Sequence, residues 1–260
     1  IAKKRVILIN KYNLLYENMK PRILISSDKY KGSLSAIEVC NIIKKTIIKI
    51  DRNVEVIVSP MADGGEGTVS TLVEGQNGKY ISVKVAGPLG KPVKARFGLL
   101  KDNTAIIEMA SASGLVLVPP DKRNPMDTTT YGTGELIKKA LDIGCKKVII
   151  GIGGSATNDA GLGMAQALGY KFYDRKGKLL GFGGKELASL YKIDASDIHK
   201  SISSCQFDVA CDVTNPLTGR NGAAYVYAHQ KGADDVMIRE LDRGLANFAK
   251  VVKKELGKDV

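Results

Sequence analysis

The chain has 260 residues, of which 44% are hydrophobic and 25% are charged, which is the composition of an ordinary globular protein. A chain of this length can bury a core without a disulfide or a metal to hold it together, and no apolar run reaches the roughly 18–20 residues of a membrane span. Composition therefore excludes a disordered tail, a fibrous repeat and an integral membrane protein.

The net charge of +12, from 39 basic and 27 acidic residues, suggests a polyanionic partner when taken alone. Only nine of the basic residues are arginines, however, and the lysines lie in scattered pairs such as Lys138-Lys139. The chain has no tryptophan, so a base-stacking surface is also poorly supplied. We therefore expect no nucleic-acid partner.

Residues 1–18 do not read as the start of a folded domain. They contain a basic cluster and a short apolar stretch, which is too brief for a signal peptide. Met19 precedes a cleaner strand pattern. We expect residues 1–18 to be a non-native or unstructured leader and Met19 to be the true start.

The first elements form a strand–helix–strand unit. Residues 22–26 are a buried-strand pattern, and residues 54–58 are a second one. Between them, Ser35 and Glu38 have the spacing of a capping box at the start of an amphipathic helix over 36–50. This order predicts two parallel strands joined by a right-handed crossover.

The middle of the chain predicts antiparallel strands followed by further α/β units. Gly87-Pro88-Leu89-Gly90 is a turn sequence between the two strand patterns. The predicted strands are 80–85, 93–100, 105–109, 147–152 and 207–211, and the predicted helices are 134–142, 159–168 and 235–256. Gly144, Gly169 and Gly257 follow these helices as stop signals. The alternation predicts an α/β fold in two lobes, and the abrupt end after Gly257 suggests a chain clipped at its C-terminus.

The four cysteines, Cys40, Cys145, Cys205 and Cys211, form no C-x-x-C pair. Both histidines lack a neighbouring ligand, so the sequence predicts no zinc site. Each cysteine stands among apolar residues and reads as a small core side chain. This pattern fits a reduced, cytoplasmic setting.

Four loops rich in Gly, Ser, Thr and Asp each follow an apolar strand. The first, 26–33, carries two lysines and hydroxyls that suit an anionic group; the alternative is a solvated turn. The second, 63–68, has three glycines with Asp63 and Glu66. Two carboxylates beside a phosphate make sense when Mg²⁺ lies between them, whereas a plain acidic turn would not need the glycines.

The third loop, 151–159, has the sharpest pattern. A strand, then Gly153-Gly154-Ser155, Thr157 and a helix with Asp159 in its first turn predict a phosphate cradle at a helix N-terminus. It lacks the Gly-Lys-[Ser/Thr] of a Walker A loop, and a structural turn is the alternative.

The fourth loop follows strand 207–211, where Asp212 and Asn215 are placed to bind a metal or a sugar-like hydroxyl. Weaker signals are Glu108 at a strand end and the threonine-rich run 128–133, which reads as a helix cap. Together the loops offer amide donors, lysines and carboxylates without a serine–histidine or cysteine–histidine pair. That set suits phosphoryl transfer, in which positioning and charge neutralisation dominate.

These motifs resemble the type 1 glycerate kinases. The resemblance runs from Met19 to Val260 and rests on SDKYKGSLSA, PMADGGEGT, EMASASGL, TTTYGTGELI, GIGGSATNDAGLGMAQALG, GGKEL, CDVTNPLTGRNGAA and QKGAD. It implies transfer of the ATP γ-phosphoryl group to D-glycerate with Mg²⁺, giving 2-phosphoglycerate rather than 3-phosphoglycerate. It also implies two α/β lobes with the active site between them: a flavodoxin-like lobe beginning at 19–60, incomplete here, and a mixed α/β lobe over 61–260.

The resemblance also implies the site residues. Substrate-binding residues are Asp28, Lys29, Ser33 and Asn215. Phosphate-binding residues are Gly64, Gly65, Thr68, Gly153, Gly154, Ser155, Thr157 and Asn158. Metal ligands are Asp63, Glu66 and Asp212, and catalytic candidates are Asp159, Asp63 and Lys31, with either aspartate open as the base.

Two features depart from the family pattern. Lys29 replaces a residue that is often serine, and the chain lacks the family's C-terminal third, so a truncated, non-catalytic remnant that only binds anions is the alternative function. A cytoplasmic enzyme, with a homodimer as the candidate assembly, is the expected setting. Changing Asp159 to alanine is expected to abolish turnover with little effect on the melting temperature.

Overall fold

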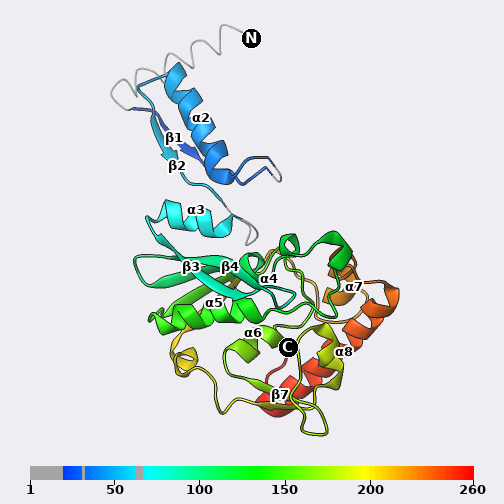
Figure 1. Ribbon diagram of the computed structural model, residues 1–260. Coiled ribbons are helices and arrows are strands. Elements are labelled where there is room, and N and C mark those ends of the chain that lie inside the picture. The colour runs from blue at the N-terminus through cyan, green and yellow to red at the C-terminus, as the bar shows by residue number, and fades with distance from the viewer. Residues whose placement is uncertain (1–19, 31–32, 62–66) are drawn as a thin grey trace. The chain divides into compact units, whose positions relative to one another are not determined.

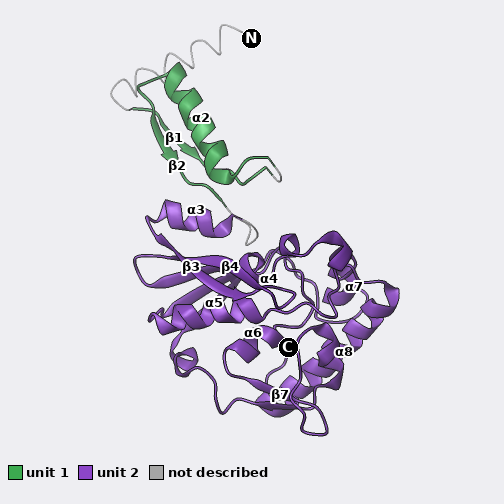
Figure 2. Ribbon diagram, in the orientation of Figure 1, with its two compact units in different colours: residues 1–61 green, residues 62–260 purple. Residues whose placement is uncertain are grey.

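The computed structural model describes residues 20–30, 33–61 and 67–260. The chain divides into two compact units, residues 1–61 and residues 62–260 (Figure 2). Among the described residues, no helix combines the length and apolar character that crossing a membrane requires.

Unit 1 contains β1 (Arg22–Ile25), α2 (Ala36–Ile50) and β2 (Glu55–Val58). The two strands pair in parallel, with Ile23 opposite Val56, as the strand–helix–strand order predicted. The capping box is confirmed: the Glu38 N–H donates to Ser35 Oγ at 3.2 Å, and the Ser35 N–H donates to Glu38 Oε2 at 2.8 Å. Helix α2 packs against both strands.

Unit 2 is built on a five-stranded mixed sheet (Figure 1). Its order is β3-β4-β5-β6-β9, with β3 and β4 antiparallel to their neighbours and β5, β6 and β9 parallel to one another. The strands are β3 (Lys79–Ala86), β4 (Pro92–Leu99), β5 (Thr104–Glu108), β6 (Lys147–Gly151) and β9 (Gln206–Ala210). All five were predicted from apolar periodicity, to within one or two residues at their ends.

Helices cover both faces of this sheet. On one face, α5 (Tyr131–Asp142) packs over a cluster that includes Ile107 and Leu136. On the other face, α3 (Thr68–Gly75) packs over a cluster that includes Val73 and Ile106. Successive strand residues point to opposite faces, so Ile106 and Ile107 serve the two clusters in turn. Helix α3 was not predicted, because its eight residues are too few to show a clear period.

A second core in unit 2 forms around the longest helix, α8 (Asp235–Leu256). It also includes the antiparallel pair β7 (Lys171–Tyr173) and β8 (Lys192–Asp194), with α7 (Ala223–Tyr227). Asp234 caps α8 by accepting from the next residues' N–H groups, and Gly257, with φ +65°, ends it as predicted. The remaining short helices are α4 (Ala110–Ser113), α6 (Leu162–Ala167) and the 3₁₀ turns η1 (Leu115–Leu117), η2 (Pro120–Lys122), η3 (Gly184–Ser189), η4 (Lys200–Ser204) and η5 (His229–Lys231).

Two expectations about local structure are wrong. The helix expected over 159–168 begins only at Leu162, because Ala160 (φ +49°) and Gly161 (φ +74°) both take left-handed backbone conformations that a right-handed helix cannot include. Cys211 is exposed and not a core residue, whereas Cys40 and Cys145 are buried as expected. Cys211 stands just after the edge strand β9, whose own residues are exposed or half-buried.

Candidate functional site

The carboxyl ends of β5, β6 and β9 lie at one edge of the sheet of unit 2. Glu108, Gly151 and Ala210 stand opposite one another in the parallel register. The loops that follow these strands therefore start side by side. This is the edge at which open α/β sheets bind ligands, and it carries the third and fourth predicted loops.

The segment Gly153–Ser155 is the donor-rich part of this edge. Two main-chain hydrogen bonds hold this segment against residues 113–115. The Leu115 N–H donates to the Gly154 carbonyl, and the Ala156 N–H donates to the Ser113 carbonyl, both at 2.9 Å. Gly154 is exposed and has φ +72°. Within the described residues, the N–H groups of Gly153, Gly154 and Ser155 have no acceptor. Unpaired amides in a glycine-rich turn form an anion-binding surface.

Asp159 follows this segment in the chain and is buried, with 1% of its surface exposed. Its Oδ2 accepts from the Thr130 N–H at 2.9 Å, from Thr130 Oγ1 at 2.8 Å and from the Gly163 N–H at 3.3 Å. Its Oδ1 accepts from the Gly161 N–H at 3.2 Å. The Thr130 hydroxyl therefore binds Asp159 and does not cap α5, which corrects the cap predicted from the threonine run.

Burial raises the pKa of Asp159, and the four hydrogen bonds act in the opposite direction. The prediction that Asp159 stands in the first turn of a helix is wrong, since α6 begins three residues later. Three of the four donors that reach its carboxylate are buried, and the fourth, the Gly161 N–H, is half-buried. We infer that Asp159 fixes the turn of residues 159–163 against Thr130, and its role as a catalytic base stays a prediction.

Lys231 is the second buried charge at this site, and sequence reasoning missed it. It is 8% exposed, and its Nζ donates to Ser155 Oγ at 2.9 Å and to the Thr157 carbonyl at 2.6 Å. The next residue, Gly232, has φ +99° and comes so close to the Arg123 backbone that a Cβ there would lie 2.1 Å from its carbonyl oxygen. The lysine before a glycine in the QKGAD motif was the only pattern that could have marked Lys231 as a site residue, and nothing in the sequence linked it to Ser155.

Burial lowers the pKa of Lys231 to about 8, while the Asp159 carboxylate acts to raise it. Its ordinary value of 10.5 applies in the unfolded chain. Between these two pH values the unfolded chain binds one more proton, so stability rises with pH. At about 1.4 kcal/mol per pKa unit, the gain is roughly 3 kcal/mol.

We therefore expect the free energy of unfolding of the natural chain to rise, relative to that of Lys231→Met, by up to roughly 3 kcal/mol from pH 7.5 to 10. Urea unfolding followed by circular dichroism at both pH values measures the difference. The exposed Lys250→Met variant is the control and should keep the pH dependence of the natural chain. Parallel curves for the natural chain and Lys231→Met would contradict the assignment.

Thr157 and Asn158 differ from Gly153, Gly154 and Ser155, because both are buried. The Thr157 carbonyl is occupied by Lys231, and Asn158 Nδ2 donates to the Ala223 carbonyl at 3.5 Å. Asn158 Oδ1 is buried without a hydrogen-bond partner among the described residues. The structure thus brings Gly153, Gly154 and Ser155 to the accessible side of the loop, and leaves the predicted roles of Thr157 and Asn158 as predictions.

Thr68, the last residue of the second predicted loop, begins a helix that is tied to the same sheet edge. Asp63, Gly64, Gly65 and Glu66 lie outside the described residues, but Thr68, the first residue of α3, is described and buried. The next N–H group, that of Val69, donates to Glu108 Oε1 at 2.8 Å. Glu108, at the end of β5, therefore ties the start of α3 to the edge that also carries Gly153–Ser155.

The fourth loop is exposed and partly closed on itself. Asn215 Nδ2 donates to the Asn221 carbonyl at 2.8 Å, and its Oδ1 accepts from the Tyr227 hydroxyl at 2.5 Å. Both ends of the Asn215 amide are thus engaged within the loop. Asp212 is exposed, directly beyond β9. Their predicted substrate and metal roles stay predictions.

The first loop lies in unit 1, after β1. Asp28 Oδ1 accepts from the Lys29 N–H at 2.7 Å, and Lys29 Nζ lies 3.9 Å from the same oxygen. Ser33 is exposed, and its N–H donates to the Tyr30 carbonyl at 2.9 Å. Lys31 lies outside the described residues. Asp28 and Lys29 are thus neighbours in one turn, as their sequence positions require.

Mg²⁺ prefers oxygen ligands and one or two carboxylates. The described part of the chain holds no group of three His, Cys, Asp or Glu side chains that could bind a metal. Two of the three predicted ligands, Asp63 and Glu66, lie outside that part. The described residues fit an anion at Gly153–Ser155, and the Mg²⁺ ligands stay a sequence prediction.

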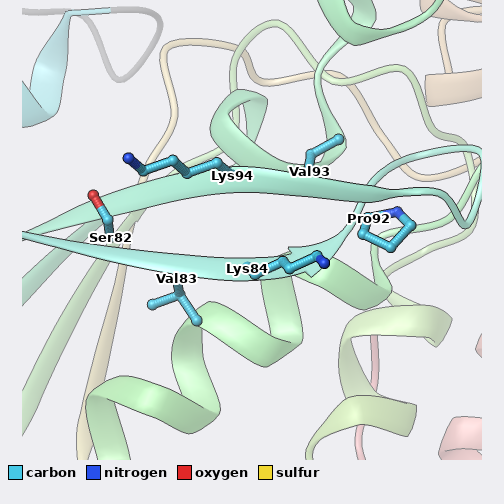
Figure 3. A pocket seen from close by; sticks show the side chains of 6 residues that line it. All are labelled: Ser82, Val83, Lys84, Pro92, Val93 and Lys94. Carbon is cyan, nitrogen blue, oxygen red and sulfur yellow. The ribbon is translucent and has the colours of Figure 1, made fainter.

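Two shallow hollows lie away from the predicted residues. One, of about 300 Å³, lies on the β3–β4 hairpin, where Lys84 and Lys94 stand directly opposite each other (Figure 3). The other, of about 210 Å³, lies between the hairpin turn and the segment Leu117–Lys122. Neither is lined by a predicted site residue.

Comparison with known proteins decides the family. The sequence model of the glycerate kinase family matches residues 23–260. The chain belongs to this family. This glycerate kinase family member is similar to the glycerate kinase of Haemophilus influenzae, at 50% identity over 240 residues, which is 92% of this chain and 64% of that protein. It is equally similar to the glycerate 2-kinase of Escherichia coli, at 50% identity over 92% of this chain and 63% of that protein.

A solved structure supports the fold of this family member. A crystal structure from Salmonella typhimurium LT2, provisionally named glycerate kinase 2, matches with a TM-score of 0.88 at 49% identity, over 93% of this chain and 65% of that one. The predicted α/β fold class is confirmed by this match and by the mixed sheet. The chain spans less than two thirds of the length of these relatives.

Proposed function

We propose that the chain carries out, or forms part of, an ATP-dependent glycerate kinase that transfers the γ-phosphoryl group to D-glycerate and gives 2-phosphoglycerate. The observation that carries the proposal is the 50% identity with the glycerate 2-kinase of Escherichia coli over 92% of this chain. The unpaired amides of Gly153–Ser155 support it, because a kinase needs fixed donors for phosphate oxygens.

The roles proposed for the residues follow from their chemistry. Gly153, Gly154 and Ser155 donate main-chain hydrogen bonds to phosphate oxygens, Lys231 holds Ser155 through its hydroxyl, and Asp159 ties the end of the loop to Thr130. Asp63, Glu66 and Asp212 are the proposed ligands for Mg²⁺, which would neutralise phosphate charge when bound. Asp28, Lys29, Ser33 and Asn215 are proposed to bind the acceptor acid. Lys31 is a proposed catalytic residue, and Asp63 or Asp159 is the proposed base.

The test is phosphorylation of D-glycerate by the purified chain with ATP and Mg²⁺. We expect ADP release that depends on D-glycerate. Phosphorus NMR of the product identifies the hydroxyl: phosphate on C2 couples to one proton and gives a doublet, whereas phosphate on C3 couples to two and gives a triplet. We expect the doublet.

The alternative function is a non-catalytic protein that only binds anions. It predicts that ADP protects the chain against thermal unfolding while no ADP is released from ATP with D-glycerate. A triplet in the NMR spectrum would instead support the kinase activity with 3-phosphoglycerate as the product. A cytoplasmic location and a homodimer stay predictions.

A further inference from the structure

Lys231 and Ser155 form a contact whose donor and acceptor are fixed by chemistry. A lysine ammonium group has three donors and no acceptor. At 2.9 Å from Lys231 Nζ, Ser155 Oγ is therefore the acceptor. The Thr157 carbonyl, at 2.6 Å from the same Nζ, can only accept as well. Both bonds thus require N–H groups from Lys231.

This contact leaves the Ser155 hydroxyl proton available. A serine hydroxyl has one proton and two lone pairs, and Lys231 uses one of the lone pairs. Within the described residues, no acceptor lies in hydrogen-bonding range of the Ser155 hydroxyl proton or of the Ser155 N–H. Ser155 is half-buried beside the exposed Gly154, so its donors are near the surface.

The arrangement is held rigidly from below. Lys231 is 8% exposed, and the segment 153–156 is tied to residues 113–115 on its other side. Asp159, which is buried nearby and binds Thr130, supplies the opposite charge. A lysine in such a place loses its rotamer freedom, so it fixes the direction of the hydroxyl that it contacts.

We propose that Lys231 is a positioning residue that turns the Ser155 hydroxyl into a hydrogen-bond donor toward an anionic oxygen of the ligand. That oxygen belongs to a phosphate of the nucleotide or to the carboxylate of the acceptor acid. Together with the N–H groups of residues 153–155, the hydroxyl makes this surface a set of donors, which favours an anion over a cation. The proposal deepens the proposed function and rests on it only for the identity of the ligand.

The test is a binding cycle with ADP and, separately, D-glycerate, measured by isothermal titration calorimetry. The proteins are the natural chain, Ser155→Ala, Lys231→Met and the double variant. We expect Ser155→Ala and Lys231→Met each to weaken the binding of one of the two ligands, and the same one in both variants. The loss should be about ten-fold or more, as for the loss of a hydrogen bond to a charged group. The double variant should bind no more weakly than the weaker single variant, because Lys231 acts through Ser155.

Control variants separate positioning from a general loss of structure. Ser155→Thr keeps the hydroxyl and should stay within about three-fold of the natural chain, and Lys250→Met should match the natural chain. If Lys231→Met fails to fold, Lys231→Gln, which keeps a side-chain donor, replaces it, and the Ser155 pair still tests the hydroxyl. The ligand whose affinity falls shows which anion the hydroxyl binds: a phosphate if it is ADP, a carboxylate if it is D-glycerate.

The proposal is overturned if Ser155→Ala leaves both affinities unchanged, if the losses add in the double variant, or if the natural chain binds neither ligand. Failure of the proposed function is distinct from these results. It would appear as absent turnover in the phosphorylation assay, while the binding cycle with ADP could still give the expected coupling.

Discussion

Replacing Asp159 by alanine is expected to lower the free energy of unfolding by about 4 kcal/mol. Three backbone N–H groups and one hydroxyl lose their acceptor, and all of these donors except the half-buried Gly161 N–H are buried. The change also leaves the Lys231 ammonium group, which is 8% exposed, without its neighbouring negative charge. Leaving several buried donors without their acceptor is among the most destabilising of single changes.

Urea unfolding followed by circular dichroism measures the loss. Asp159→Asn keeps the shape but places an amide group among donors, so we expect a smaller loss of about 2–3 kcal/mol. Asp102→Ala is the control: Asp102 is exposed and accepts one backbone bond, from Thr104, so its loss should stay below about 1 kcal/mol.

A double variant shows whether Asp159 and Lys231 act as a pair. The double variant combines Asp159→Asn with Lys231→Met and so has no Lys231 ammonium group left without its neighbour. Its loss in the free energy of unfolding should therefore be smaller than the sum of the two single losses. Additive losses would contradict the pairing. A loss below about 1 kcal/mol for Asp159→Ala would contradict its role as a buried support.

These contacts lead us to expect a larger loss of stability in Asp159→Ala than the small effect on the melting temperature expected from sequence. A carboxylate with 1% exposure and four internal hydrogen bonds cannot be removed without cost. Lost turnover in Asp159→Ala would therefore result from the destabilised loop as well as from any loss of a catalytic group. Asp159→Asn, with the smaller structural cost, is the better variant for the question of a base.

The parts of the fold that could be predicted are those that depend on local sequence. The capping box of Ser35 and Glu38, the stop at Gly144 with φ +88° and the stop at Gly257 are all as expected. Apolar periodicity located the five strands of the main sheet, since buried strands and β-branched residues coincide there. These signals act within a few residues of one another.

The contacts that build the site could not be predicted in the same way. Lys231 and Ser155 are 76 positions apart in the chain, and Asp159 meets Thr130 across 29. The sequence did place Gly153, Gly154 and Ser155 at a strand end, because glycines after an apolar run are a local pattern. It could not show that Ala160 would adopt φ +49° and delay the helix, since that strain is held by tertiary contacts.

Gly132→Ala is expected to be as damaging as the loss of Asp159, for a steric reason. Gly132 is in the first turn of α5, and a Cβ built on it would lie 1.8 Å from the carbonyl oxygen of Ala86, the last residue of β3. The strand end cannot easily move away, because the Ala86 N–H is bound by Glu135 Oε2 at 2.6 Å. We expect a loss of about 3 kcal/mol or more, which lowers the melting temperature by roughly 6–12 °C.

Gly75→Ala provides the matched control, because it adds the same methyl group to another helix of unit 2. Nothing lies within 4 Å of a Cβ at Gly75, and its backbone conformation is one that alanine can adopt. This variant should be unchanged or more stable by up to about 1 kcal/mol, since alanine has less conformational freedom to lose on folding. Equal melting temperatures for the two variants would show that α5 and the end of β3 do not approach each other this closely. A selective loss in Gly132→Ala would establish the contact that holds the hairpin against the helix.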